Sequence, residues 1–176
     1  PDGSGPAPAR LVAAGDFSIA GAQGANNIAA WDGNLWTPLG SGMNAWVSSL
    51  AILPGGDLVA AGNFTSAGGV SANRIARWNG TAWSALGTGM GGEVCALAVL
   101  PGGDRVAGGG FVSAGGVSAS RIARWNGSAW SAFGTGMNGD VRSLAVQSNG
   151  LLVAGGNFTN AGGVSANRIA RWSGSA

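Results

Sequence analysis

The sequence repeats itself every 47 residues, and this period limits the chain to a small set of folds. One tryptophan and one phenylalanine mark each unit, at Trp31, Trp78, Trp125 and Trp172 and at Phe17, Phe64, Phe111 and Phe158. A second tryptophan follows five residues later at Trp36, Trp83 and Trp130. We predict that all of these aromatic residues are structural. A fixed period of this size is typical of small units that bury their apolar faces only against their neighbours.

Each unit reads as four β-strands. In the most complete unit they are expected at residues 94–100, 105–111, 121–125 and 129–133. The first is a short continuous apolar run, as in a strand buried on both faces, and Pro101-Gly102-Gly103-Asp104 after it has turn composition. Asn126-Gly127 suits the tight turn of a hairpin. Residues 113–119 are expected to form a longer loop. Four strands in a unit of this length predict one blade of a β-propeller.

We therefore expect an all-β chain, a β-propeller of about four 47-residue repeats. Residues 1–9 contain three prolines and are predicted to be a linker. The repeats then divide the chain into a partial blade at 10–46, blades at 47–93 and 94–140, and a second partial blade at 141–176. The first unit lacks its inner strand and the last lacks its outer strand. Unpaired strand edges favour association, so the expected partners are other proteins or further copies or repeats of the chain.

The composition argues against most catalytic chemistry. The chain has no histidine, lysine or tyrosine, which removes the usual general bases and acids. The acids are scattered and are read as turn residues, and Cys95 is the only cysteine. We expect no enzyme activity, no cofactor and no metal site, although Asp57 and Asp104 leave a calcium site as an alternative. Without a basic run or a long apolar run, neither nucleic-acid binding nor membrane insertion is expected.

The order of motifs within a unit resembles the kelch repeat. The matching residues are Gly108-Gly109, Trp125 and Trp130, and the string Arg121-Ile122-Ala123-Arg124-Trp125-Asn126-Gly127 is similar to tandem kelch-like repeats of large secreted or surface proteins of bacteria. The chain departs from kelch in having tryptophan where tyrosine is usual and Ala61 in place of a glycine. The resemblance implies a propeller and a secreted or cell-surface location. A copper-radical oxidase, another implication of kelch, would need tyrosine and histidine ligands.

Two sets of residues are candidates for ligand binding. Trp46, Glu93 and Asp140 occupy one equivalent position that differs between units, just before the first strand. Arg74, Arg121 and Arg168 repeat beside tryptophans, and either grip acidic glycans or pack between blades by stacking on Trp rings and bonding carbonyls. The sequence favours a non-enzymatic structural or protein-interaction module. The alternatives are a glycan-binding, lectin-like propeller and a non-catalytic part of a larger extracellular enzyme.

Overall fold

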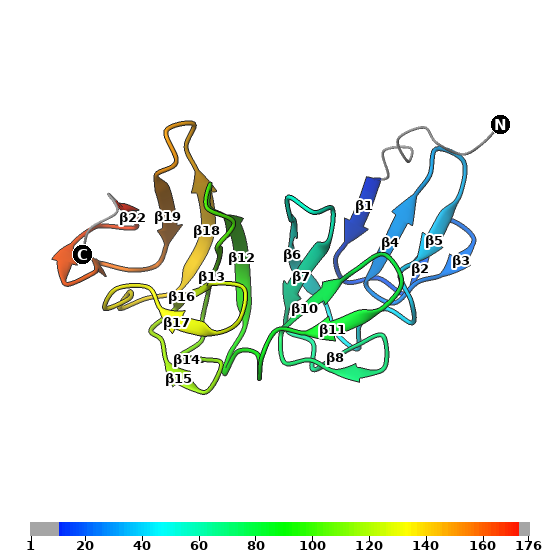
Figure 1. Ribbon diagram of the computed structural model, residues 1–176, viewed down its shortest axis with the longest axis horizontal. Helices are drawn as coiled ribbons and strands as arrows, with labels where there is room; N and C mark the ends of the chain where they lie inside the picture. The colour runs from blue at the N-terminus through cyan, green and yellow to red at the C-terminus, as the bar shows by residue number, and fades with distance from the viewer. Residues whose placement is uncertain (1–10, 173–176) are drawn as a thin grey trace.

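The computed structural model describes residues 11–172, and every regular element in this range is a β-strand. Four antiparallel sheets follow one another along the chain and stand side by side in that order (Figure 1). Their strands are, sheet by sheet, β1 (Leu11–Ala14), β4 (Ile28–Trp31) and β5 (Trp36–Pro38); β6 (Val47–Ile52), β7 (Leu58–Gly62), β10 (Ile75–Trp78) and β11 (Trp83–Ala85); β12 (Val94–Val99), β13 (Arg105–Gly109), β16 (Ile122–Trp125) and β17 (Trp130–Ala132); and β18 (Val141–Val146), β19 (Leu152–Gly156) and β22 (Ile169–Trp172). The linker predicted at residues 1–9 lies outside the described residues.

The sheets are arranged as blades. Strands β6, β12 and β18 come first in their sheets, and β12 packs against both of the others. Within the described residues, no strand pairing joins the first sheet, β1–β4–β5, to the last, β18–β19–β22. The prediction of an all-β chain of antiparallel blade-like sheets is therefore confirmed, and the row of sheets has two open ends.

The strands are shorter than predicted, and the backbone explains where they stop. The strand expected at 121–125 begins at Ile122 because Arg121 has a left-handed conformation, with φ of 64°. The strand expected at 94–100 ends at Val99 because the Leu100 N–H donates to the Asp104 carbonyl and closes the following turn. A β-bulge also separates Val94 from Ala96, which makes Cys95 the extra residue of that strand.

The loop expected at residues 113–119 is a small hairpin instead. Strands β14 (Ser113–Ala114) and β15 (Val117–Ser118) pair across Gly115 and Gly116, which have φ angles of 61° and 85°. Glycine adopts such angles more readily than any other residue, so the Gly-Gly pair was an available signal of a tight turn. The same hairpin recurs in the other units as β2 (Ile19–Ala20) with β3 (Gln23–Gly24), β8 (Ser66–Ala67) with β9 (Val70–Ser71), and β20 (Asn160–Ala161) with β21 (Val164–Ser165).

The hydrophobic core lies between the sheets and consists of three clusters, one for each pair of neighbouring sheets. Phe64, Phe111 and Phe158 are fully buried in these clusters. Phe17, which faces the open end of the row, is only half-buried. The same residue type is therefore buried or not according to whether a neighbouring sheet covers it.

The second tryptophan of each unit bonds across the boundary between sheets. The Trp83 Nε1–H donates to the Leu39 carbonyl at 2.8 Å, and the Trp130 Nε1–H donates to the Leu86 carbonyl at 2.9 Å. Both indoles are 5% exposed. A buried carbonyl needs a partner, so each indole stabilises the boundary both by apolar burial and by satisfying an acceptor of the preceding sheet.

Replacing Trp130 with alanine should lower the free energy of unfolding by about 3–5 kcal/mol, because it empties a buried aromatic site. Trp46 is 40% exposed, and its replacement with alanine should cost under about 1 kcal/mol. Trp130→Phe keeps most of the apolar contact and strands the Leu86 carbonyl, for an intermediate loss of about 1–3 kcal/mol. Denaturant titration of the three variants measures these losses, and equal losses for Trp130→Ala and Trp46→Ala would contradict the account.

Candidate functional site

Two sets of loops meet at one end of the sheets, which is the lower end of the two central sheets in Figure 1, where β8, β14 and β15 are labelled. One set leads from the last strand of a sheet into the next sheet, and the other is the set of small hairpins. Isolated bridges join them across each boundary, between Met43 and Ala67, Met90 and Ala114, and Met137 and Ala161. We call this end the loop rim. It contains the variable positions chosen from the sequence.

At the variable positions the backbone is fixed, although the side chain differs. The carbonyls of Trp46, Glu93 and Asp140 accept hydrogen bonds from the N–H groups of Asn63, Gly110 and Asn157, at 3.1, 2.9 and 2.8 Å. The partner strand approaches so closely that a Cβ added at Gly109 would lie 2.1 Å from the Glu93 carbonyl oxygen. Because the hydrogen bond that repeats in each blade uses main-chain atoms, the side chain at this position is free to change from blade to blade.

The structure brings several candidate residues together in a polar cluster formed by Glu93, Cys95, Arg121, Asp140 and Arg142. Arg142 donates to the Asp140 carboxylate at 2.9 Å, and its other guanidinium nitrogen lies 3.7 Å from the Cys95 sulfur. Arg121 Nε is 3.7 Å from the same carboxylate, too far for a hydrogen bond. Trp46 occupies the equivalent position two blades before Asp140 and is partly exposed.

Cys95 is a poor nucleophile in this setting. Burial, the largest cause, raises the pKa of its thiol, the Glu93 carboxylate raises the pKa further, and Arg142 lowers it through its charge and its hydrogen bond. The net shift is upward, so the reactive thiolate is scarce at neutral pH. The cluster therefore holds paired charges around a protonated thiol.

In the two middle repeats, the side chain of the first arginine bonds to the backbone of the following loop. Arg74 and Arg121 have left-handed backbones, with φ of 66° and 64°, and donate to the carbonyls of Met90 and Met137 at 3.0 and 3.3 Å. Asn27 makes the equivalent bond to the Met43 carbonyl at 2.9 Å. Asparagine tolerates a left-handed backbone better than most residues, so its presence at this position was the signal that the sequence reading missed.

The arginines of one repeat point to opposite ends of the sheet. Arg77 pairs with Asp57, and Arg124 Nε lies 3.4 Å from Asp104, both at the turn end and away from the loop rim. Arg168, the remaining candidate, is exposed and has φ of 67°. For Arg74 and Arg121 these placements agree with the predicted bonding of carbonyls.

Three acidic side chains near turns also have partners within the chain. Asp57 and Asp104 pair with arginines, and Asp32 accepts the Asn34 and Leu35 N–H groups at 2.8 Å. Across residues 11–172 no group of three or more acidic, cysteine or histidine side chains is placed to hold a metal ion.

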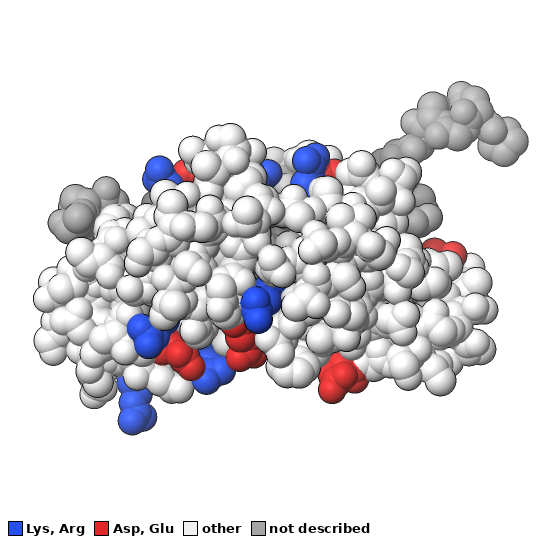
Figure 2. Space-filling model, turned by 90° about the horizontal axis from the view of Figure 1, so that it is seen from below, with Lys and Arg blue, Asp and Glu red and all other residues white. Residues whose placement is uncertain are grey.

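Figure 2, which views the molecule from below, shows the charged side chains gathered in a few places on a largely uncharged face. None of the described elements is a helix long and apolar enough to cross a membrane.

Replacing Arg142 with glutamine should raise the pKa of Cys95, because it removes the charge that lowers it and leaves the effects of burial and of Glu93. The rate of iodoacetamide alkylation should therefore reach half of its plateau at a higher pH than in the unchanged chain. The midpoint, rather than the rate at a single pH, separates ionisation from access to the thiol. A midpoint that stays in place or falls would contradict the described cluster.

Comparison with known proteins agrees with the described fold. The model of a β-propeller domain of unknown function, DUF5122, matches residues 54–80 and 147–171. The crystal structure of the WD40 β-propeller domain of Doa1 is similar with a TM-score of 0.52 and 19% sequence identity. The similarity covers 82% of this chain and 42% of that one, so the chain spans less than half of that domain. A comparison with curated proteins gives no match. The repeats, the sheets and both similarities show that this chain is a β-propeller repeat protein.

Proposed function

We propose that the chain is a non-enzymatic protein-interaction module of a secreted or cell-surface protein, and that its partners are further repeats or copies of the same kind. The observation that carries this proposal is the exposure of apolar sheet faces at both ends of the row. These faces are equivalent to faces that are buried elsewhere in the same chain.

The last sheet, β18–β19–β22, has an open outer face. Ile169 on this face is 66% exposed, whereas its equivalents Ile28, Ile75 and Ile122 are at most 1% exposed beneath the following sheet. The four residues occupy the same position in their strands, β4, β10, β16 and β22. The difference therefore comes from the missing next sheet, and covering Ile169 would gain the burial already seen three times in the chain.

The first sheet, β1–β4–β5, has the complementary open face. Leu11 is 62% exposed, but its equivalents Leu58 and Leu152 are 6% and 2% exposed against the preceding sheet. Exposed apolar sheet faces are typical of interaction surfaces. A blade of the same type presents the apolar groups that each face packs against within this chain.

Other features favour the finer parts of the proposal. Asp57, Asp104 and Asp140 form ion pairs, and burial raises the pKa of the Cys95 thiol. Both observations fit an absence of catalysis. The low content of charged residues, 9%, and the kelch-like strings fit a repeat module of a secreted or surface protein. The kelch-like assignment and the location are part of this proposal.

Glycan binding is the second candidate, and exposed Trp46 on the loop rim favours it because exposed aromatic rings can stack on sugars. A glycan site built from the repeating arginines is less favoured, because the side chains of Arg74 and Arg121 already donate hydrogen bonds to backbone carbonyls. Retention on a glycan array that is lost in Trp46→Ala would favour this candidate. A third possibility is that the module is the non-catalytic part of a larger extracellular enzyme.

Light scattering of the 176-residue chain over a range of concentrations tests the main proposal. We expect a mass above 17.1 kDa that rises with concentration, because the open faces associate. Ile169→Asp should return the mass toward that of the monomer. Ile52→Asp is the matched control, since Ile52 is 70% exposed on an inner strand away from the open faces, and it should change nothing. A monomer at every concentration would overturn the proposal.

A further inference from the structure

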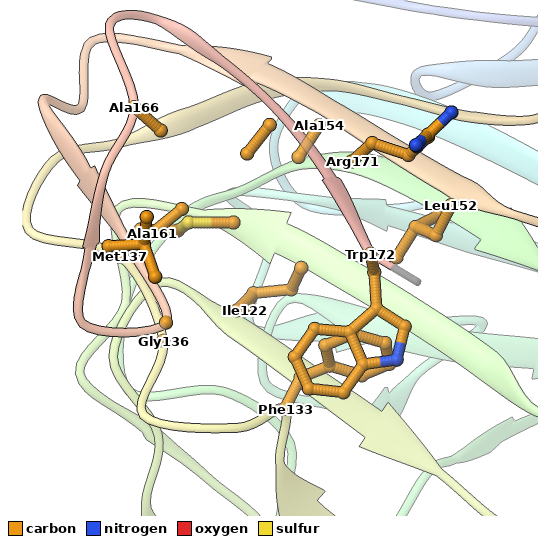
Figure 3. A pocket seen from close by; sticks show the side chains of 13 residues that line it. Ile122, Phe133, Gly136, Met137, Leu152, Ala154, Ala161, Ala166, Arg171 and Trp172 are labelled. Atoms are coloured by element: carbon orange, nitrogen blue, oxygen red, sulfur yellow. The ribbon is translucent and has the colours of Figure 1, made fainter. Parts of the chain in front are cut away.

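One position at the boundaries between sheets holds leucine in two sheets and arginine in a third. Leu58 and Leu152 are 6% and 2% exposed against the preceding sheet, and Figure 3 shows Leu152 in a mostly apolar wall with Phe133 and Trp172. Arg105 is at the equivalent position, 47 residues from each leucine. A charge at a partly buried site costs free energy unless it is paired, so packing alone does not account for this arginine.

Arg105 has no acidic partner. It is the first residue of β13 and is half-buried. Within the part of the chain that the structure describes, it forms no ion pair, and its Nε is buried without a hydrogen-bond partner. The acids of the adjoining turns, Asp57 and Asp104, already pair with Arg77 and Arg124. The positive charge of Arg105 is therefore left without a counter-charge.

A small pocket lies beside Arg105, between the second and third sheets. Residues of the two sheets line its opposite sides, among them Arg77, Ser84 and Leu86 of the second and Arg105, Trp125 and Gly127 of the third. A Cβ added at Gly127 would lie 3.9 Å from Arg105 Nη1, which places the tip of the arginine at the pocket. Arg105 and Trp125 are opposite each other in β13 and β16, so both project from the same face of their sheet.

We propose that this pocket binds the carboxylate of an aspartate or glutamate side chain that a partner protein presents. The planar guanidinium group binds carboxylates through paired, charge-assisted hydrogen bonds. Because Asp57 already neutralises Arg77, the pocket has one unbalanced positive charge, on Arg105. One carboxylate balances that charge, whereas a phosphate group would bring an excess of negative charge. The site goes beyond the proposed function, because it lies between two covered sheets and away from the open faces.

The size of the pocket favours an acidic side chain over an acidic sugar. Its volume is about 90 Å³, which is the space of about three water molecules. The carboxylate of aspartate or glutamate is carried on methylene groups, so its end enters without the rest of the residue. A uronate carboxylate is attached to the sugar ring, which is too large to follow it. Leu53, Leu86 and Trp125 supply apolar contacts for the methylene groups.

The test uses nitrogen–proton NMR spectra of the 176-residue chain, in which the arginine Nε–H groups and the Gly127 amide are followed. The Arg105 signal is identified by its loss in Arg105→Leu. The probe is the α-amide of N-acetyl-aspartate, whose side-chain carboxylate is its one charge. We expect a saturable shift of the Arg105 Nε–H and Gly127 signals. The α-amide of N-acetyl-asparagine is the neutral control, and it should bind at least about tenfold more weakly because it lacks the charge.

Two protein variants locate the site through the Gly127 amide signal. Arg105→Leu restores the leucine of the equivalent positions and should weaken binding at least about tenfold. Its melting temperature should equal or exceed that of the unchanged chain, because leucine packs at this position in two other sheets. Arg171→Leu makes the same change at an exposed residue that does not line the pocket, and it should bind as the unchanged chain does.

Three results would overturn the site: no saturable shift with the acidic amide, equal affinity for the neutral amide, or full binding by Arg105→Leu. Glucuronate is titrated in parallel, and tighter binding of glucuronate than of the acidic amide would overturn the choice of a protein side chain. The light-scattering test of the proposed function is independent, because Ile169 does not line this pocket. A chain that self-associates but binds no carboxylate would keep the interaction module and lose this site.

Discussion

The structure depends on burial between sheets, because no sheet has a core of its own. Each cluster of buried residues is shared by two neighbouring sheets, and the indoles of Trp83 and Trp130 bond to carbonyls of the sheet before their own. Such a contact contributes apolar burial and also satisfies an acceptor that would otherwise be stranded. A blade at the end of the row, with a neighbour on one side only, receives half of this stabilisation and exposes the other half.

This constraint separates positions that hold the fold from positions that are free to vary. Residues such as Phe111 and Ile122 face a neighbouring sheet and are buried, so the repeat preserves them. At Trp46, Glu93 and Asp140 the fold uses only main-chain atoms. The side chains at these positions therefore differ between blades, and they place different functional groups on the loop rim. The cluster of Arg142, Asp140 and Cys95 shows how neighbouring blades combine such positions, since Cys95 and Arg142 are one full repeat apart in sequence.

The sequence predicted the strands and their order well because the fold repeats a local pattern of apolar runs and turn residues four times. It did not predict the hairpin at Ser113–Ser118, because two-residue strands carry no periodic signal. It also did not separate the two arginines of a repeat, of which Arg121 bonds the Met137 carbonyl and Arg124 pairs with Asp104 at the opposite end. That separation comes from the left-handed backbone at Arg121 and from contacts distant in sequence.

Amide hydrogen exchange at low protein concentration tests most directly whether each sheet owes its stability to its neighbours, because exchange reports local opening of each strand. The account predicts the slowest exchange in β7, β10, β13 and β16, which lie in sheets covered on both faces, and much faster exchange in β1 and β22 at the open ends. Equal protection of β16 and β22, strands with nearly the same sequence, would show that a sheet is stable without its neighbour and would contradict the account.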